Sequence, residues 1–255
     1  RLSWPYDDLV SGNYIAKVGL PAFITMVALA FSDRTNFSNL AGSISILVIF
    51  VLAMTGERVN FLILICSGFL AGISWRPSLK RVLKVTVANA FIIVAVLYFL
   101  PSEKQSRLLE LFDDSQFNYS QEHFRTVMGG FEAFKAAPVV GVGPGNYRLV
   151  SHSLLQDKPH LRPDNHPHNF YVQLLAETGI IGLILGSILA GSIIWTCYRA
   201  GRKIKDHIFF QTAWVIPFGF FWPVATSADF FGQWNNIFMW SSVALALCCT
   251  RWKSA

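Results

Sequence analysis

Long apolar runs alternate with short polar segments along most of the chain. Each run approaches the roughly 20 apolar residues that a helix needs to cross a bilayer, and the prolines inside two of them, Pro21 and Pro217, are tolerated in membrane helices. The pattern therefore predicts an all-α fold, a polytopic transmembrane bundle with about seven spans. The predicted spans are 14–31, 39–56, 59–75, 82–100, 178–197, 208–225 and 234–250.

One long polar segment, residues 101–167, interrupts this series. It divides the chain into four spans within 1–100, a large loop, and three spans within 168–255. Apolar positions in the loop predict a helix over 121–136, a short helix over 147–156 and a membrane-surface helix over 103–112.

The glycine-rich run 141–146 predicts a tight turn between two helices, because Pro144 removes an amide donor that a phosphate-binding loop would use. Pro159, Pro163 and Pro167 predict non-helical chain until a helix resumes at His168 and continues through the fifth span.

Composition and charge fit this organisation. Hydrophobic residues make up 53% and charged residues only 14% of the 255, whereas soluble domains carry roughly 25% charged residues. The net charge of +6 is concentrated in the hinges at 76–84 and 199–205, which the positive-inside rule places in the cytoplasm. We therefore expect the 101–167 loop on the periplasmic side of a bacterial inner membrane, membrane lipids as partners, and no nucleic acid.

The four cysteines form no C-x-x-C pair, so neither a disulfide framework nor a zinc ribbon is indicated. The chain begins with Arg1 rather than Met, so we expect it to be part of a longer protein. In the fifth span, Gly182 and Gly186 have the spacing of small residues that pack closely in lipid. That spacing favours packing inside the bundle over a homodimer face, and the oligomeric state stays open.

The outer loop holds five of the six histidines: His123, His152, His160, His166 and His168. The densest polar cluster, 164–169, has three interpretations. Asp164, His166 and His168 could bind a divalent ion, Asp164 or Asn165 could cap the following helix, or His168 could act as a general base. Because a residue before proline favours extended backbone, we expect the rings of His166 and His168 to diverge.

Four arginines are expected on the outer side, namely Arg58, Arg125, Arg148 and Arg162. Arg58 lies in a very short turn between two spans, where an ionisable residue is a functional candidate and snorkelling to lipid headgroups is the alternative. The planar guanidinium binds phosphate oxygens bidentately, so together these arginines could hold a lipid-linked pyrophosphate.

Three segments together resemble the O-antigen ligase and polymerase superfamily, in their C-terminal part. They are Thr55-Gly56-Glu57-Arg58, the run from Phe134 to Tyr147 with its Pro-Val-Val-Gly-Val-Gly turn, and the run from His166 to Gly182 that begins His-Pro-His-Asn. The resemblance extends over essentially the whole chain. Members of that superfamily usually have about a dozen spans, so we expect several N-terminal helices of the longer protein to lie outside this sequence.

The resemblance implies an inverting glycosyl transfer that needs no metal and no cofactor. A glycan would move from an undecaprenyl-pyrophosphate carrier to a sugar hydroxyl, the lipid A core in a ligase. The resemblance assigns pyrophosphate binding to Arg58 and acceptor activation to His168. The other expected substrate contacts are His123, Arg125, Arg148, Arg162, His166, Asn169 and Glu177.

Two alternatives stay open at the level of sequence. The superfamily often carries an arginine one helix ahead of the glycine-rich turn; His123 lies nearest that position and Arg125 two residues later. A polymerase that delivers to a second carrier-linked repeat, a protein O-glycosyltransferase and a polysaccharide transporter are the competing functions. Transporters keep their polar features near the bilayer midplane, whereas here they gather in the outer loop and at span ends.

Overall fold

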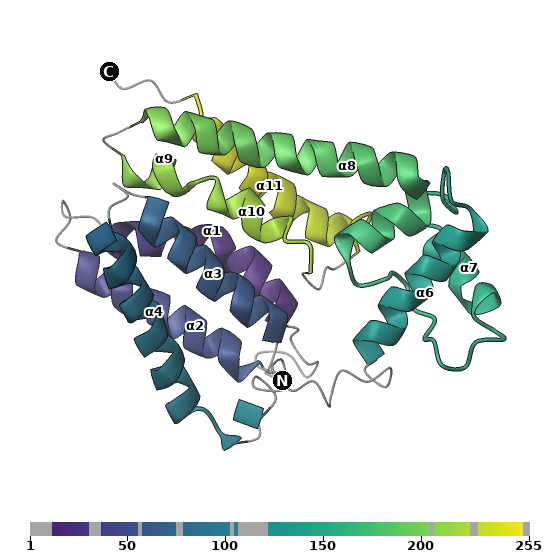
Figure 1. The fold of residues 1–255 in the computed structure, drawn as a ribbon, viewed down its shortest axis with the longest axis horizontal. Helices are drawn as coiled ribbons and strands as arrows, with labels where there is room; N and C mark the ends of the chain where they lie inside the picture. The colour runs from purple at the N-terminus through teal and green to yellow at the C-terminus, as the bar shows by residue number, and fades with distance from the viewer. Residues whose placement is uncertain are drawn as a thin grey trace. The chain divides into compact units, whose positions relative to one another are not determined.

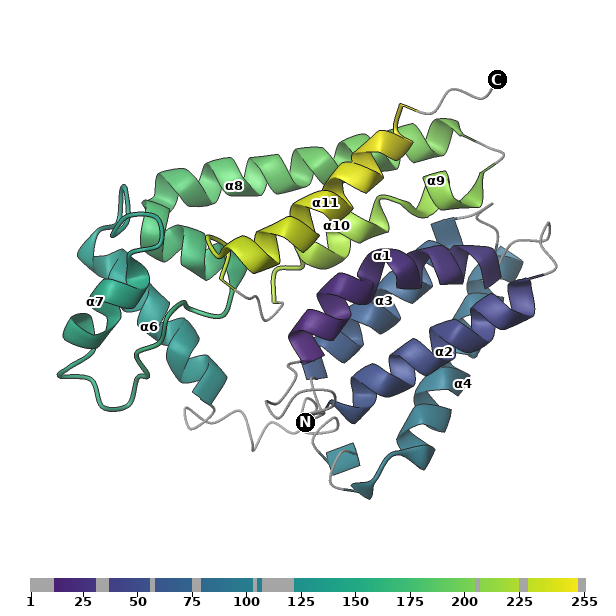
Figure 2. The ribbon, with the colours of Figure 1, turned by 180° about the vertical axis from the view of Figure 1, so that it is seen from behind.

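The structure is a computed structural model that describes residues 12–30, 37–55, 58–74, 79–102, 105–106, 122–204, 207–224 and 229–251. The regular elements in these ranges are all α-helices (Figures 1 and 2). They are α1 (Gly12–Ala30), α2 (Ser38–Met54), α3 (Arg58–Ser74), α4 (Leu79–Phe99), α6 (Glu122–Ala136), α7 (Tyr147–Leu154), α8 (Phe170–Lys203), α9 (Ile208–Thr212), α10 (Val215–Phe220) and α11 (Gln233–Cys249).

The all-α prediction is confirmed, and two of the described helices are long and apolar enough to cross a membrane. They are α4, over Val82–Phe99, and α8, over Phe170–Lys203. The other predicted spans correspond to shorter apolar helices, so the number seven stays a prediction. The expected surface helix at 103–112 lies almost entirely outside the described residues.

The sixth predicted span, 208–225, is not one helix. A turn at 213–214 separates α9 from α10. Pro217 has no N–H to donate to the carbonyl of Ala213, and the helix restarts so that the proline lies in its first turn, where a missing donor costs least.

The two long helices leave apolar side chains uncovered. On α4, Leu83, Val87, Phe91, Val94 and Tyr98 are 60–78% exposed and follow one another at helical spacing. Ile184, Leu185, Ile188 and Leu189 on α8 are also exposed. A water-soluble surface rarely carries apolar patches of this extent, and hydrocarbon surrounds them without cost in a bilayer. The exposed stripes support a membrane protein.

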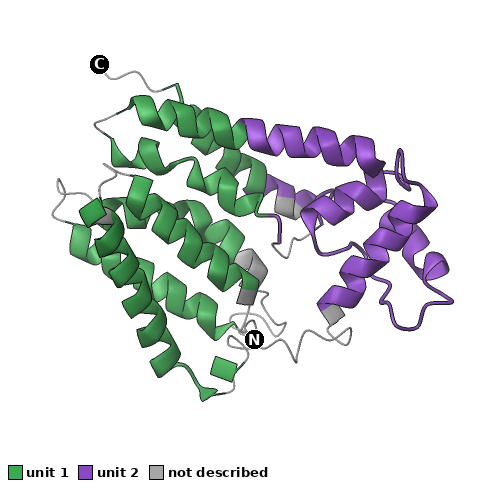
Figure 3. Ribbon diagram, viewed as in Figure 1, with its two compact units in different colours: residues 1–112, 193–222, 239–255 green, residues 113–192, 223–238 purple. Residues whose placement is uncertain are grey.

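The chain divides into two compact units (Figure 3). The first unit comprises residues 1–112, 193–222 and 239–255. In it, α1 packs against α2 and α3, and the short helices α9 and α10 pack against α1 and α3. Leu20, Phe23, Ile24 and Leu64 are almost completely buried in this unit.

The second unit comprises residues 113–192 and 223–238 and holds most of the candidate site residues. Its helices α6 and α7 confirm the two predicted loop helices, and residues 155–169 are non-helical as the prolines predicted. Ala133 of α6, Tyr147 of α7 and Ala176 of α8 form its buried apolar cluster, with Val142 and Leu154 packed against them.

A break in α8 corrects the prediction of one continuous helix from His168. The helix begins at Phe170, and Gly179 leaves the helical region with φ 66° and ψ −165°. The bend is visible in Figure 1. A Cβ on Gly186 would collide with Leu174 and one on Gly182 with Thr178. These two glycines therefore let the parts of α8 before and after the break pack closely together.

The glycine-rich turn after α6 fits into this break through backbone hydrogen bonds. The amides of Val142 and Gly143 donate to the carbonyls of Ala176 and Glu177, at 3.0 and 2.9 Å, and the amide of Ile180 donates to Pro138 at 3.0 Å. Because Gly179 interrupts the helix, carbonyls that would bond within it are available to the turn. Gly141, at φ +69°, lies against the backbone of Glu177 and Thr178, where a Cβ has no room.

Replacing Gly141 by alanine should therefore cost more stability than the same change at Gly145. Both glycines have positive φ, but a Cβ on Gly145 meets nothing within 4 Å. Gly145→Ala should show only the left-handed backbone penalty, about 1–2 kcal/mol, whereas Gly141→Ala adds a collision with backbone that cannot rotate away. Thermal unfolding of the purified variants in detergent measures the difference. Equal losses would mean that the turn is not docked as described.

Candidate active site

The histidine cluster is centred on His168, which lies just before α8. Its backbone has φ 57°, the only positive value among the described non-glycine residues. Its Nε2 lies 3.2 Å from Oδ2 of Asp164. The ring centroid of His166 is 4.2 Å away and that of His123, from the start of α6, is 6.1 Å away. Three imidazoles and a carboxylate from two parts of the loop therefore meet at one place.

The predicted divergence of the two loop rings is wrong. Pro167 does separate His166 from His168, but the backbone at His168 is left-handed, and the two rings lie 4.2 Å apart at a 47° tilt. The residue-before-proline rule restricts His166 alone, so it could not anticipate the conformation two residues later.

Asp164 is held by Asn165, by His168 and by Ser151 of α7. Its backbone carbonyl accepts a hydrogen bond from the buried Ser151 hydroxyl at 3.0 Å. Burial works to raise the pKa of the Asp164 carboxyl. The amide of Asn165 and the ring of His168 outweigh burial and hold the pKa below its ordinary value. Asp164 is thus a carboxylate at neutral pH and can orient an imidazole.

The helix cap is Asn169 rather than Asp164 or Asn165. Its Oδ1 accepts hydrogen bonds from the amides of Tyr171 and Val172, at 3.0 and 3.1 Å, which is the geometry of an N-cap. Its Nδ2 donates to the carbonyl of Pro223 at 2.9 Å. The carboxylate of Asp164 instead accepts from the next amide, that of Asn165. The side chain of Asn169 is therefore used to fix the start of α8 beside His168.

Glu177 lies at the centre of a buried polar network. It is 1% exposed, and its carboxylate accepts from the amides of Gly145 at 2.5 Å and Tyr147 at 3.4 Å. The side-chain amide of Gln173 donates to Glu177 at 3.5 Å and to Asp229 at 2.6 Å. The carboxylate thus binds the start of α7, where free amides favour an anion. These contacts support a positioning role for Glu177 rather than substrate contact.

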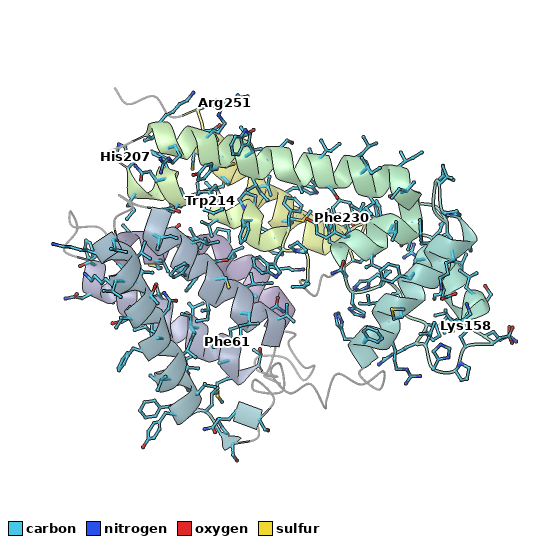
Figure 4. All side chains as sticks on the ribbon, in the orientation of Figure 1. Phe61, Lys158, His207, Trp214, Phe230 and Arg251 are labelled. Carbon is cyan, nitrogen blue, oxygen red and sulfur yellow. The ribbon has the colours of Figure 1, made fainter. Side chains whose placement is uncertain are left out.

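Gln173 and Asp229 are site residues that sequence reasoning missed. Gln173 is fully buried, and its Oε1 accepts from the amide of Phe230, whose ring contacts Phe170 at 4.8 Å. Figure 4 labels Phe230 in this region. Two signals were available: Gln173 and Glu177 are one helical turn apart in an apolar helix, and Asp229 is the sole acidic residue after position 206.

Arg125 holds the loop that follows α7. Its Nε donates to the carbonyl of His160 and its Nη2 to that of Pro159, both at 2.7 Å. An ion pair between Lys158 and Glu132 ties the same loop to α6, and Lys158 is labelled in Figure 4. The hydrogen bonds from Lys135 and Lys158 lower the pKa of Glu132. The guanidinium of Arg125 is therefore committed to protein carbonyls, whereas the ring of His123 faces His168.

Three predicted arginines remain, namely Arg148, Arg162 and Arg58. Arg148 and Arg162 have exposed side chains in the same unit. Arg58 is the first residue of α3, in the other unit, and its side chain is not described. Among the described residues, no three His, Cys, Asp or Glu side chains are arranged to hold a metal ion, so the metal interpretation of Asp164, His166 and His168 gains no support.

The fold and the site define an α-helical protein with apolar helices of membrane-spanning length and a histidine–carboxylate cluster at the start of α8. A family model of O-antigen ligases matches residues 43–186, more than half of the chain, and the chain belongs to that family. Comparison with curated proteins gives no match. Family membership identifies a membrane protein of lipopolysaccharide biosynthesis, with glycan processing of the O-antigen ligase or polymerase type, and indicates a glycosyl-transfer enzyme.

The Arg125 contacts generate a structural prediction. Arg125→Ala and Arg125→Lys should both release the loop at 158–162, because neither side chain can donate to two carbonyls in the same fork. Hydrogen–deuterium exchange of peptides covering 155–165 should rise in both variants. His123→Ala, the control two residues away, should leave that exchange unchanged. Unchanged exchange in both Arg125 variants would return Arg125 to the candidates for phosphate binding.

Proposed function

We propose that the protein transfers a glycan from undecaprenyl pyrophosphate to an acceptor sugar hydroxyl, on the lipid A core, at the periplasmic face of the inner membrane. The acceptor oxygen attacks the anomeric carbon while His168 takes its proton. The bond from that carbon to the pyrophosphate oxygen breaks, and the carrier pyrophosphate leaves with the electron pair, so the configuration inverts. The observation that carries the proposal is the His168–Asp164 pair.

The backbone of His168 supports a functional role. A non-glycine residue in the left-handed region costs about 1–3 kcal/mol and persists where neighbours fix it, often at functional sites. Here the neighbours are Asp164, which contacts the ring, and Asn169, which caps the next helix. In the tautomer that donates Nε2–H to Asp164, Nδ1 is the ring nitrogen that can accept a proton. The carboxylate also stabilises the imidazolium that forms.

We assign the second imidazole, His123, to the donor phosphate. Its ring lies 6.1 Å from that of His168 and takes the place nearest the arginine that the superfamily often carries. Arg125 then acts through the loop that it holds. Arg58 is assigned to the pyrophosphate on the family resemblance, because its residue type and its place at the first position of α3 suit that role. The arginines would supply the positive charge without a divalent ion, and His123 would add to it where it is protonated.

The glycans of a deletion strain test the proposal. Loss of polymer from lipid A with carrier-linked polymer retained is the expected result for a ligase. A product that carries a single repeat would instead identify a polymerase, and an unchanged glycan profile would reject both. Restoration by the wild-type gene, but not by the His168→Ala variant, links the phenotype to the site.

His168→Ala should lower turnover by about 10²- to 10⁴-fold, the usual contribution of a general base. His166→Ala should cost less, and His152→Ala, which removes an exposed imidazole from α7, should cost nothing. Single-turnover rates and donor affinity should be measured in excess chelator. Equal losses in the His166 and His168 variants, together with weakened donor binding, would make the two histidines a binding unit. Activity that a chelator abolishes and one divalent ion restores would reject the metal-free reaction.

Arg58→Ala should impair transfer more than Arg58→Lys, because lysine keeps the charge but loses the bidentate fork. The matched control is Lys80→Ala, which removes an exposed positive charge at the start of α4. Transfer should be measured at equal protein level in the membrane fraction. Wild-type transfer in Arg58→Ala would leave lipid snorkelling as the only role of this residue.

The donor KM should depend on pH through His123. Desolvation and the nearby His168 lower the pKa of His123 below its ordinary value, so the ring is neutral at pH 7. Acidification through this lowered pKa makes the ring cationic, and the donor KM should then fall. His123→Arg carries a permanent charge and should show a low KM with little change between pH 5.5 and 7.5. Arginine in place of the exposed His152 is the control. A pH-dependent KM that persists in His123→Arg would contradict the assignment.

A further inference from the structure

A polar cavity lies in the first unit, at the C-terminal end of α8. It has a volume of about 440 Å³, and its lining includes Trp195, Arg199, Lys203 and Thr250. Ligand sites in proteins typically have volumes of about 300–1,000 Å³, so the cavity is large enough for a polar headgroup. None of the residues that line it belongs to the histidine cluster or to the Glu177 network.

The cavity is positively charged, and its own lining does not neutralise it. Arg199 and Lys203 are four residues apart on the same face of α8, both exposed, and the described lining contains no carboxylate. Like charges at this spacing destabilise a helix unless an anion lies near them. Thr196 also lines the space and adds a neutral donor, whereas the hydroxyl of Thr250 already donates to the carbonyl of Leu247 at 2.6 Å. The arrangement suits a phosphate group.

Aromatic residues indicate that this end of α8 lies at headgroup depth. Trp195 is 58% exposed and stacks on Tyr198, with the ring centroids 6.0 Å apart. The guanidinium of Arg199 lies over the ring of Trp195, 5.8 Å from its centroid. Exposed Trp and Tyr at the end of an apolar helix are typical of the membrane–water interface, and a cation over an indole is attracted to the ring.

A smaller cavity on the neighbouring stripe of α8 provides a contrast. It has a volume of about 200 Å³ and is lined by Arg202, Gln211 and Trp214, among others. The indole N–H of Trp214 already donates to Ser74 at 3.1 Å, and Gln211 donates to the carbonyl of Ile204 at 2.6 Å. Figure 4 labels Trp214. The indole of Trp214 and the amide of Gln211 are thus used within the protein, and the cavity is smaller than typical ligand sites of about 300–1,000 Å³.

We propose that the larger cavity binds one anionic phospholipid, with its phosphate between Arg199 and Lys203 and its acyl chains along the exposed apolar flank of α8. Basic pockets beside transmembrane helices suit anionic headgroups, and arginine pairs strongly with phosphate oxygens. Binding at this cavity is independent of the transfer reaction, because no residue of the histidine cluster takes part in it.

The experiment uses the purified chain in a non-ionic detergent with phosphatidylglycerol, phosphatidylcholine or inorganic phosphate. Lipid retention is measured by native mass spectrometry and stabilisation by the shift in Tm. The wild-type protein should retain one phosphatidylglycerol and gain stability from it, but not from phosphatidylcholine. The double variant Arg199→Gln with Lys203→Gln should bind phosphatidylglycerol about tenfold more weakly or worse, because two charge-assisted hydrogen bonds are lost.

The matched control is Lys80→Gln with Lys84→Gln, which removes two exposed charges from the start of α4. It should bind phosphatidylglycerol within twofold of wild type. Trp195→Leu keeps an apolar side chain but removes the ring under Arg199. This single substitution should be enough to weaken phosphatidylglycerol binding. Equal loss in both double variants would show a general charge effect and overturn the proposal. Equal stabilisation by inorganic phosphate would identify a free-anion site and also overturn it.

All variants should elute as one species and keep the helical circular dichroism of the wild type, since the substituted side chains are exposed. If the double variant fails this check, it is replaced by Arg199→Lys, which keeps the positive charge but loses the bidentate guanidinium. Its phosphatidylglycerol affinity should fall between those of the wild type and the double variant. Wild-type affinity in Arg199→Lys would assign binding to charge alone and overturn the guanidinium contact.

Discussion

The candidate site depends on one buried carboxylate, that of Glu177, at the point where a turn meets an interrupted helix. It accepts hydrogen bonds from the amides of Gly145 and Tyr147 and thereby fixes the start of α7. α7 in turn presents Ser151 to the carbonyl of Asp164, and the side chain of Asp164 contacts His168. An unpaired carboxylate buried this completely would be very costly, so the amides and Glu177 require one another. The position of His168 therefore depends on backbone amides outside the histidine cluster, those of Gly145 and Tyr147.

The same dependence explains which parts could be predicted from sequence. Helices α6 and α7 follow from the spacing of apolar residues in the loop, and the non-helical chain from 155 to 169 follows from its prolines. The identity of the clustered residues was also accessible, because His166, His168 and Asp164 lie within five positions of one another. Local patterns of this kind are encoded in short stretches of sequence.

Features that depend on distant partners were not accessible. From sequence alone, Gly179 is predicted to continue the helix within an apolar run. The break there becomes favourable because the amides of Val142 and Gly143 donate to two carbonyls just before it. Asn169 is a good cap by residue type, but Asp164 and Asn165 are equally good, and only the hydrogen bonds of the folded chain distinguish Asn169. Arg125 illustrates the same limit, because its partners are carbonyls more than 30 residues away.

The break at Gly179 also separates two requirements that a continuous helix would have to meet together. One is the length needed to cross a membrane, and the other is the orientation of Glu177. The 24 residues that follow it, 180–203, make a helix of about 36 Å at 1.5 Å per residue, enough by themselves to cross a hydrocarbon core of roughly 30 Å. The nine residues before the break are not needed to cross the hydrocarbon core. An extra residue on the membrane side can be absorbed by tilt. An extra residue on the other side would turn Glu177 by about 100°, given 3.6 residues per turn, away from the amides that it binds. Bilayer thickness and site geometry can thus vary independently in this family member.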